Sequence, residues 1–482
     1  MVQKAGNKNL KKVSPKEVDR VFQLQKENRW KIATSSANDR IKKIKLLKAT
    51  VEKYEEDLKE AMRLDFRKSP HEVLITEIMP VINEANDAIH NLKNWMKPVD
   101  VPTPLFLFPS QSQIIYEAKG VVLIIGPWNY PFHLIMAPLV ASIASGNCAM
   151  IKPSNNTPNT SNLVRKMLDE IFPENEIKVM AADRDTANEL LEKPFDHIFF
   201  TGSPSVGVTI MEAAAKNLTS VTLELGGKSP AIIDKNTDLD SIISRVLWGK
   251  ILNGGQTCVG IDYALVHESK YSEFIEKIKK QILVFYGEDN NSWQTTPDFC
   301  RIVNDKNYTR LKETLEAALK KGAKIEQGGN FDPKERYISP TIVSNVDTNS
   351  PLMKEELFGP ILPVLKFSDL DEAIKVVQSK EKPLALYLFS ESEDTIQKVL
   401  ANTSSGGAVI NGCIAHLGNS NLPFGGVNHS GLGNYHGHFG FKAFSHERSV
   451  LRLSKFTPVK LLFPPYTNFT KRFSKLIMNY LS

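Results

Sequence analysis

Short apolar segments that alternate with helical stretches constrain the fold of this chain most strongly. A first series of strand-length apolar runs occupies 121–125, 148–151, 177–181 and 197–200, and a second occupies 231–233, 264–267, 385–389 and 408–410. Strands that are apolar on both faces and alternate with helices predict parallel sheets covered by helices. We therefore expect an α/β protein with two doubly wound open units that follow each other along the chain.

Polar and proline-rich sequence separates the other parts of the chain. Two amphipathic helical stretches come first, and the second is expected over residues 38–64. Four prolines between residues 98 and 109 then end the helical pattern, and the polar, β-prone residues 111–119 predict an excursion from the core. The length of 482 residues allows roughly three domains. The proportions of 41% hydrophobic and 24% charged residues are typical of a globular protein.

The cysteine pattern bears on compartment and metal binding. Cys148, Cys258, Cys300 and Cys413 form no C-x-x-C pair, and no histidine stands at metal-ligand spacing from them. We therefore expect neither a disulfide framework nor a metal site. The basic start of the chain lacks the apolar run of a signal peptide, and no window approaches the roughly 20 apolar residues of a membrane span. A reducing, cytoplasmic location is expected.

The end of the chain is locally basic. Residues 448–482 contain seven Lys or Arg and no Asp or Glu, whereas the net charge of the whole chain, +6, gives no indication of nucleic-acid binding. Apolar residues recur at helical spacing at Phe469, Phe473, Leu476, Ile477, Tyr480 and Leu481. Residues 456–482 are thus expected to be a tail with an amphipathic helix. Docking on the body or on a partner subunit is favoured over contact with a membrane surface.

Two short motifs carry reactive side chains. Residues 223–230, Leu-Glu-Leu-Gly-Gly-Lys-Ser-Pro, include Glu224, and residues 255–258, Gly-Gln-Thr-Cys, end at Cys258, 34 positions later. A thiolate can attack an electrophilic carbon, and a carboxylate can take a proton from the water that breaks the covalent intermediate. A free cysteine is usually a small buried hydrophobe, but glycines before Cys258 permit an exposed approach. We expect a lowered pKa for Cys258 and a raised pKa for Glu224.

A proline-flanked turn follows the first buried strand. It reads Gly-Pro-Trp-Asn-Tyr-Pro over residues 126–131 and places Asn129 just past the strand. An Asn amide in such a rigid turn can stabilise the negative oxygen that develops when sulfur attacks a carbonyl carbon. The alternative is that Asn129 only caps a turn, as a lone Asn usually does.

Taken together, these motifs resemble those of the NAD(P)-dependent aldehyde dehydrogenase superfamily. The resemblance extends to residues 200–207, Phe-Thr-Gly-Ser-Pro-Ser-Val-Gly, and 356–360, Glu-Leu-Phe-Gly-Pro. Residues 423–446 are similar to the class 3 branch, which includes fatty and aromatic aldehyde dehydrogenases. One departure is Ile261, where the family usually has a proline after the nucleophile, and this change removes no catalytic group.

The resemblance implies a bound NAD or NADP and the residues that hold it. These residues are Trp128, Lys152, Gly202, Ser203, Glu356 and Phe358. Gly202 and Ser203 open a helix whose N–H groups can receive a pyrophosphate. Lys152 ends a strand and corresponds to a lysine that contacts the adenine ribose. The family's usual glutamate three residues later is Asn155 here, and an amide does not repel a 2′-phosphate, which is compatible with NADP.

The resemblance also implies a three-part subunit and a homodimer. Its parts are a cofactor-binding domain over residues 1–105 and 121–224, a catalytic domain over 225–417, a β bridging and oligomerisation element over 106–120 and 418–455, and the C-terminal tail. In fatty aldehyde members a similar tail lies over the substrate entrance and aids membrane association.

The reaction that the resemblance implies is oxidation of a medium- or long-chain aliphatic or aromatic aldehyde to a carboxylic acid through a thiohemiacetal and a thioester. Cys258 is the nucleophile, Asn129 holds the oxyanion and Glu224 activates the hydrolytic water. Tyr130 and His416 are candidates for lining the substrate channel, with ordinary packing as the alternative. Two rival functions are an acylating, coenzyme A-dependent relative and a non-catalytic binding relative. The presence of all three catalytic groups argues against both.

Overall fold

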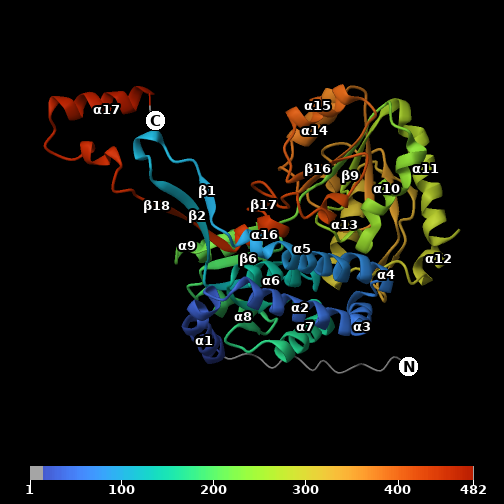
Figure 1. The fold of residues 1–482 in the computed structure, drawn as a ribbon. Coiled ribbons are helices and arrows are strands. Elements are labelled where there is room, and N and C mark those ends of the chain that lie inside the picture. Colours follow the sequence, from blue (N-terminus) through green and yellow to red (C-terminus); the bar gives the residue numbers. More distant parts are fainter. Residues whose placement is uncertain (1–14, 481–482) are drawn as a thin grey trace.

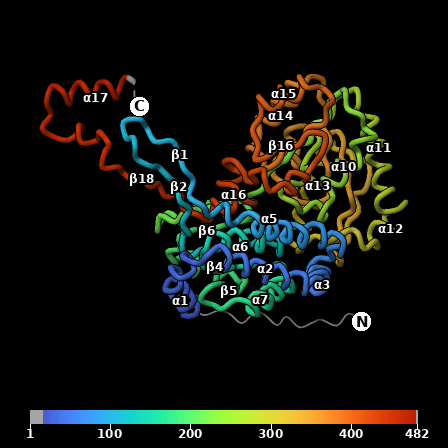
Figure 2. Tube along the Cα trace, in the orientation of Figure 1, coloured from blue at the N-terminus to red at the C-terminus, as the bar shows by residue number. Residues whose placement is uncertain are grey.

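The computed structural model describes residues 15–480. Figure 1 shows two bodies that lie against each other and an arm that projects from the first body. The Cα trace in Figure 2 shows that the chain passes through the first body, then the second, and returns past the first to the arm. Among the described residues, no helix is long and apolar enough to cross a membrane.

The first body is built on a six-stranded sheet of order β17-β7-β6-β3-β4-β5. Its strands are β3 (Val121–Ile125), β4 (Cys148–Lys152), β5 (Ile177–Val179), β6 (His197–Thr201), β7 (Ser220–Glu224) and β17 (Gly431–Leu432). All neighbours are parallel except β17, which pairs antiparallel with β7. From β3 the chain first adds β4 and β5 on one side of the sheet and then returns to add β6 and β7 on the other side. The strand order therefore reverses between β3 and β6. Ligands of open α/β sheets bind at such a point, outside the carboxyl ends of the strands.

Helices cover both faces of this sheet. On β3, Val121 and Leu123 belong to one apolar cluster and Val122 and Ile124 to another, which is the two-residue alternation of a strand buried on both sides. The first cluster includes residues of α1 (Pro15–Ala33), α8 (Arg184–Leu191) and α9 (Pro204–Ala215). The second includes residues of α2 (Ala37–Lys53), α3 (Glu55–Phe66), α5 (Met79–Trp95), α6 (His133–Ser145) and α7 (Pro158–Ile171).

The second body is built on a seven-stranded sheet of order β10-β13-β14-β9-β8-β15-β16. Its strands are β8 (Pro230–Ile233), β9 (Tyr263–His267), β10 (Lys324–Gln327), β13 (Thr341–Ser344), β14 (Ile361–Phe367), β15 (Ala385–Phe389) and β16 (Gly407–Ile410). Only β10, at one edge, is antiparallel. The helices around it are α10 (Leu239–Ile251), α11 (Glu268–Tyr286), α13 (Asp305–Leu319), α14 (Leu370–Gln378) and α15 (Glu393–Asn402). The two successive doubly wound units expected from the sequence are thus confirmed.

Shorter elements lie within these units. They are α4 (Pro70–Val73), a π-helical turn over Leu74–Ile78, α12 (Asn290–Thr295), the hairpin of β11 (Phe331–Asp332) and β12 (Tyr337–Ile338), and α16 (Gly437–Ala443). The helix expected over 38–64 is two helices, because Tyr54 lies outside the helical region and separates α2 from α3.

The arm is a three-stranded antiparallel sheet of β1 (Val99–Val101), β2 (Gln111–Ala118) and β18 (Ser445–Arg452). Every residue of β2 pairs with a residue of β18, from Gln111 with Arg452 to Ala118 with Ser445. The expectation that all of 418–455 belongs to this element is wrong. Strand β17 joins the six-stranded sheet and α16 packs on α5 and α6, so residues 431–443 belong to the first body.

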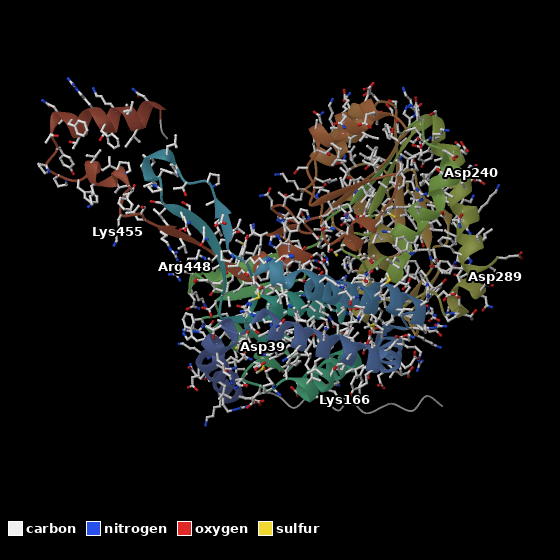
Figure 3. The ribbon with its side chains drawn as sticks, viewed as in Figure 1. Asp39, Lys166, Asp240, Asp289, Arg448 and Lys455 are labelled. Carbon is white, nitrogen blue, oxygen red and sulfur yellow. The ribbon has the colours of Figure 1, made fainter. Side chains whose placement is uncertain are left out.

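The tail follows β18 and ends in α17 (Asn468–Tyr480). Figures 1 and 3 show this helix beside the tip of the arm and away from both bodies, with Arg448 and Lys455 along the path that leads to it. Phe469 and Met478 on the helix are 63% and 68% exposed. Docking of the tail on the subunit's own body is therefore not observed. Leu481, part of the predicted apolar pattern, lies outside the described residues.

Candidate active site

Four parallel strands of the first sheet end in residues that the sequence singles out. Glu224 is the last residue of β7, Gly202 follows β6, Asn129 lies in the turn after β3, and Lys152 is the last residue of β4. The carboxyl ends of parallel strands meet at one sheet edge. The fold therefore brings together side chains that lie up to 95 positions apart, from Asn129 to Glu224.

One cavity of about 240 Å³ collects most of the predicted residues. Its lining includes Trp128, Asn129, Gly202, Ser203, Glu224, Cys258, Glu356 and Phe358. Lys152 is not part of this lining and lies at the end of β4, the strand next to β3 at the same edge. The second body supplies Cys258, Glu356 and Phe358, so the cavity lies where the two sheets' units meet.

The cavity has the features of a dinucleotide site. The rings of Trp128 and Phe358 meet edge to face, with centroids 5.3 Å apart. Phe358 has φ +53°, a strained value for a bulky residue that is typical of functional sites. At the other end, Ser203 begins α9 without a side-chain cap, so the first N–H groups of that helix are free to receive a phosphate. An aromatic slot and an anion-binding helix terminus fit the two halves of NAD or NADP.

A second cavity of about 340 Å³ reaches Cys258 from the other side. Its lining is mostly apolar and includes Met79, Leu134, Trp248, Leu252, Ile414 and Phe424. Tyr130 is part of this lining, as are His133, Tyr435 and His436, which the sequence did not single out. Cys258 is the residue that the two linings share. A sulfur in that position can meet a substrate in one cavity and a cofactor in the other.

His416 does not line the second cavity. Its ring packs behind the cavity wall, with its centroid 5.9 Å from that of Phe424 and 6.5 Å from that of Tyr387. The packing alternative stated for His416 therefore agrees with its position, whereas Tyr130 lies where a channel-lining residue would be.

Hydrogen bonds tie the nucleophile loop to the turn that carries Asn129. The Asn129 side-chain amide donates to the backbone carbonyl of Gln256 at 3.0 Å. The Asn253 side-chain amide donates to the backbone carbonyl of Asn129 at 2.9 Å. The Tyr130 hydroxyl and the Thr257 hydroxyl are 2.6 Å apart. Asn129 is 4% exposed and lines the same cavity as Cys258, and its hydrogen bond to Gln256 fixes the orientation of its amide.

Glycine is required where the nucleophile loop meets the residues 356–360. Gly255 has φ +75°, and a Cβ on it would lie 2.3 Å from the Gly359 carbonyl oxygen. A Cβ on Gly226 would lie 2.2 Å from a carboxylate oxygen of Glu356. The backbone of the nucleophile loop thus approaches that of Gly359 more closely than a side chain would allow, and Gly226 leaves room for the Glu356 carboxylate.

Burial dominates the electrostatics of the site. It raises the pKa of Glu224 well above its ordinary value, and the carboxylate has no hydrogen-bond partner within the described protein. Burial also raises the pKa of Glu356 to about 8, with Asp262 adding to the effect. The pKa of Cys258 is raised to about 12 by burial and then by the charges of Glu356 and Glu224. The expectation of a lowered thiol pKa is thus wrong for the protein without cofactor, because burial disfavours the thiolate and two carboxyl groups add to this effect.

Two charged residues that the sequence did not assign hold the cofactor side of the site. Arg310 lines the first cavity and donates to the carbonyls of Glu356 and Leu357 at 3.3 and 2.6 Å. Lys228, inside the glutamate motif, pairs with buried Asp262. The position of Lys228 in that motif was a signal of function, whereas Arg310 lies in an ordinary helical sequence and gave none.

Comparison with known proteins decides the family. The model of the aldehyde dehydrogenase family matches residues 5–450. This chain belongs to the aldehyde dehydrogenase family. It is therefore an NAD(P)-dependent oxidoreductase that acts on aldehydes, as the sequence motifs predicted.

Individual relatives agree with the class 3 resemblance. The chain is 44% identical over 433 residues to the 4,4′-diaponeurosporen-aldehyde dehydrogenase of Staphylococcus aureus, with 90% of this chain and 93% of the relative covered. It is 41% identical over 428 residues to aldehyde dehydrogenase family 3 member A2 of Macaca fascicularis, with 88% and 87% covered. The solved structure of a substrate-bound state of Staphylococcus aureus AldH superposes with a TM-score of 0.91 at 42% identity, covering 95% of this chain and 99% of that one.

Proposed function

We propose that this aldehyde dehydrogenase oxidises medium- and long-chain aliphatic or aromatic aldehydes. The observation that carries the proposal is that Cys258 lines both the cavity with the aromatic pair Trp128 and Phe358 and the mostly apolar cavity. An apolar cavity binds a substrate by removing hydrocarbon surface from water, at roughly 0.8 kcal/mol for each buried CH₂. The name of the related S. aureus enzyme, 4,4′-diaponeurosporen-aldehyde dehydrogenase, supports an aldehyde substrate.

In the proposed mechanism, each catalytic residue acts at a stated atom. The Cys258 sulfur attacks the aldehyde carbon after its proton is removed, and the Asn129 amide with the Cys258 backbone N–H stabilises the oxyanion. NAD or NADP held in the cavity lined by Trp128 and Phe358 would supply the hydride acceptor for that carbon, and a thioester would remain on Cys258. Glu224 then takes a proton from water as the water attacks the thioester, and the carboxylic acid and the free thiol result.

The raised pKa of the Cys258 thiol in the unliganded site predicts that cofactor binding precedes attack on the aldehyde. With its pKa raised to about 12, the Cys258 thiol is protonated at neutral pH and is a poor nucleophile. A cation close to Cys258 lowers the pKa of a thiol, and the oxidised nicotinamide carries a positive charge. The protein therefore gains its reactive thiolate when cofactor is present.

Trp128, Gly202, Ser203, Glu356 and Phe358 are the residues proposed to hold the cofactor, with Lys152 at the adenosine end. The supporting observations are the aromatic slot, the uncapped start of α9 and the carboxylate that faces the shared cavity.

Steady-state kinetics test the proposal. Reduced cofactor is measured for aldehydes of increasing chain length with the wild type, with Cys258→Ala and with Cys148→Ala, whose thiol lies buried in β4. We expect Cys258→Ala to abolish turnover and Cys148→Ala to retain it, with KM falling as the chain lengthens. Equal KM values for acetaldehyde and long-chain aldehydes would contradict the proposed substrate class. Acid formation that requires coenzyme A would favour the acylating alternative.

The cofactor preference is proposed to include NADP. Asn155 is exposed, and no carboxylate occupies that position beside Lys152. Isothermal titration calorimetry of NAD and NADP with the wild type and with Asn155→Glu tests this. We expect the added carboxylate to weaken NADP binding at least tenfold and to leave NAD binding within threefold. Unchanged NADP binding would show that residue 155 does not contact the 2′-phosphate.

We also propose a homodimer formed through the arm, in a reducing, cytoplasmic compartment. Strand β18 lies at an open edge of the three-stranded sheet, and its Leu451 is 48% exposed. An open, partly apolar edge can pair with a second chain. Light scattering gives the oligomeric state, and a deletion after residue 455 tests whether the tail covers a partner subunit or binds anionic vesicles. A monomer at micromolar concentration would exclude the dimer.

A further inference from the structure

Lys68 and Glu77 form an ion pair that is wholly buried, with 2.8 Å between Nζ and Oε1. Lys68 follows the left-handed residue that ends α3, and Glu77 lies in the π-helical turn over Leu74–Ile78. A buried ion pair seldom stabilises a fold more than apolar residues of the same size would. Single π-turns inside helices are rare and occur frequently at functional sites. Both observations favour a functional role for the two side chains, which their other contacts identify.

The second carboxylate oxygen of Glu77 holds the end of the turn that carries Asn129. It accepts from the backbone N–H of Phe132 at 3.2 Å and from that of His133 at 2.9 Å. These groups open α6, whose N-terminus favours a negative charge. Phe132 lies three residues after Asn129, so Glu77 fixes the distal end of the proposed oxyanion turn.

The ammonium of Lys68 holds the middle of the same turn. Its Nζ lies 4.1 Å from the centroid of the Tyr130 ring, a distance at which a cation is attracted by the ring face. The Tyr130 hydroxyl in turn contacts the hydroxyl of Thr257. A line of contacts thus runs from Lys68 through Tyr130 to the residue next to Cys258.

We propose that Lys68 and Glu77 are positioning residues that set the location of Asn129 relative to Cys258. The inference rests on the proposed role of Asn129 as the oxyanion donor. A donor is effective only when it is aimed at the place where charge develops, and small displacements weaken it strongly. The pair touches neither cavity, so it acts through the turn of residues 126–132 and not on substrate or cofactor.

A double-mutant cycle tests the inference. Asn129→Ala, Glu77→Gln and the combined variant are compared by kcat/KM for a long-chain aldehyde, with NAD dissociation constants from calorimetry as an independent measurement. Removal of one oxyanion donor lowers the rate by about 10²- to 10³-fold. We expect Glu77→Gln alone to lower kcat/KM roughly tenfold, and the combined variant to be no slower than Asn129→Ala, because residues that act through one another are not additive. The NAD dissociation constant is expected to change less than twofold.

Two further variants keep the test independent of folding. Lys68→Met combined with Glu77→Gln removes both charges and leaves neither buried alone, so this double variant can take the place of Glu77→Gln in the cycle if the single variant is unstable. Glu176→Gln removes the partner of Lys43, a half-buried pair outside both cavities, and is expected to keep wild-type kinetics.

The outcomes separate the inference from the proposed function. Losses that multiply in the combined variant, or a Glu77→Gln enzyme with wild-type kcat/KM, would overturn the positioning role. Wild-type kcat/KM in Asn129→Ala would overturn the oxyanion assignment itself, and the inference with it.

Discussion

Replacement of Lys228 by methionine is predicted to destabilise the second body and to weaken cofactor binding together. The Lys228 ammonium is 8% exposed, pairs with Asp262, and donates to the carbonyls of Leu352 and Glu355 at 3.0 and 2.8 Å. Asp262 uses its other oxygen to accept the backbone N–H of Leu357 at 2.9 Å. Lys228, directly and through Asp262, thus holds the glutamate motif against residues 352–357.

The magnitude follows from the unpaired charge that remains. Removal of one partner from a buried pair costs about 3–5 kcal/mol, and each kcal/mol lowers Tm by about 2–4 °C in a unit of 150–250 residues. We expect a decrease of roughly 10 °C by differential scanning calorimetry. The segment that Lys228 holds carries Glu356 and Phe358, so calorimetric titration should also show at least tenfold weaker NAD binding.

A compensated variant identifies the cause. Lys228→Met with Asp262→Asn removes both charges of the pair and keeps an oxygen that can accept from Leu357, so it should recover at least half of the lost Tm. A shift below about 2 °C for Lys228→Met with unchanged NAD affinity would refute the reasoning. A double variant no more stable than the single one would show that the hydrogen bonds, and not the charge balance, dominate.

Three further predictions concern the site directly. Glu224→Gln should give a burst of reduced cofactor followed by turnover slowed about 10²- to 10⁴-fold, with an acyl adduct on Cys258 by mass spectrometry; full turnover would exclude Glu224 as the base. Gly226→Ala should weaken NAD binding by displacing the Glu356 carboxylate, and calorimetry would show no change if Glu356 does not contact the ribose. The raised pKa of Glu356, about 8, predicts tighter NAD binding as pH rises from 7 to 9. In the unliganded protein the pKa of Glu356 is higher than in the unfolded chain. Its contribution to the free energy of unfolding is therefore complete below about pH 4.5 and is lost as the pH rises to about 8.

The sequence predicted the sheets where strands are apolar and short, and failed where other residues interrupt them. β14 contains Pro363, a residue that usually argues against a central strand. β13 ends in a serine and lasts only four residues, too few for a periodic pattern. The break at Tyr54 between α2 and α3 was also missed, because no glycine or proline marks it.

The sequence identified the site's motifs but not the burial and the neighbouring charges that set the pKa values of its side chains. Glu224 and Cys258 stood out because their glycine neighbours are informative, and the structure brings both into one cavity. The thiol pKa was predicted in the wrong direction, because it depends on burial and on Glu356, which lies 98 positions away in the chain. Lys68 and Glu77 gave no signal at all, since a charged residue in a helical segment usually faces solvent.

The shared wall at Cys258 has a consequence for inhibition. The apolar cavity and the cavity with Trp128 and Phe358 have only Cys258 in common in their linings, so an aldehyde in one and a cofactor in the other would meet at the sulfur and share no other wall. In kinetic terms, a compound that fills the apolar cavity would compete with aldehyde but not with cofactor, and two inhibitors, one for each cavity, could occupy the same subunit together.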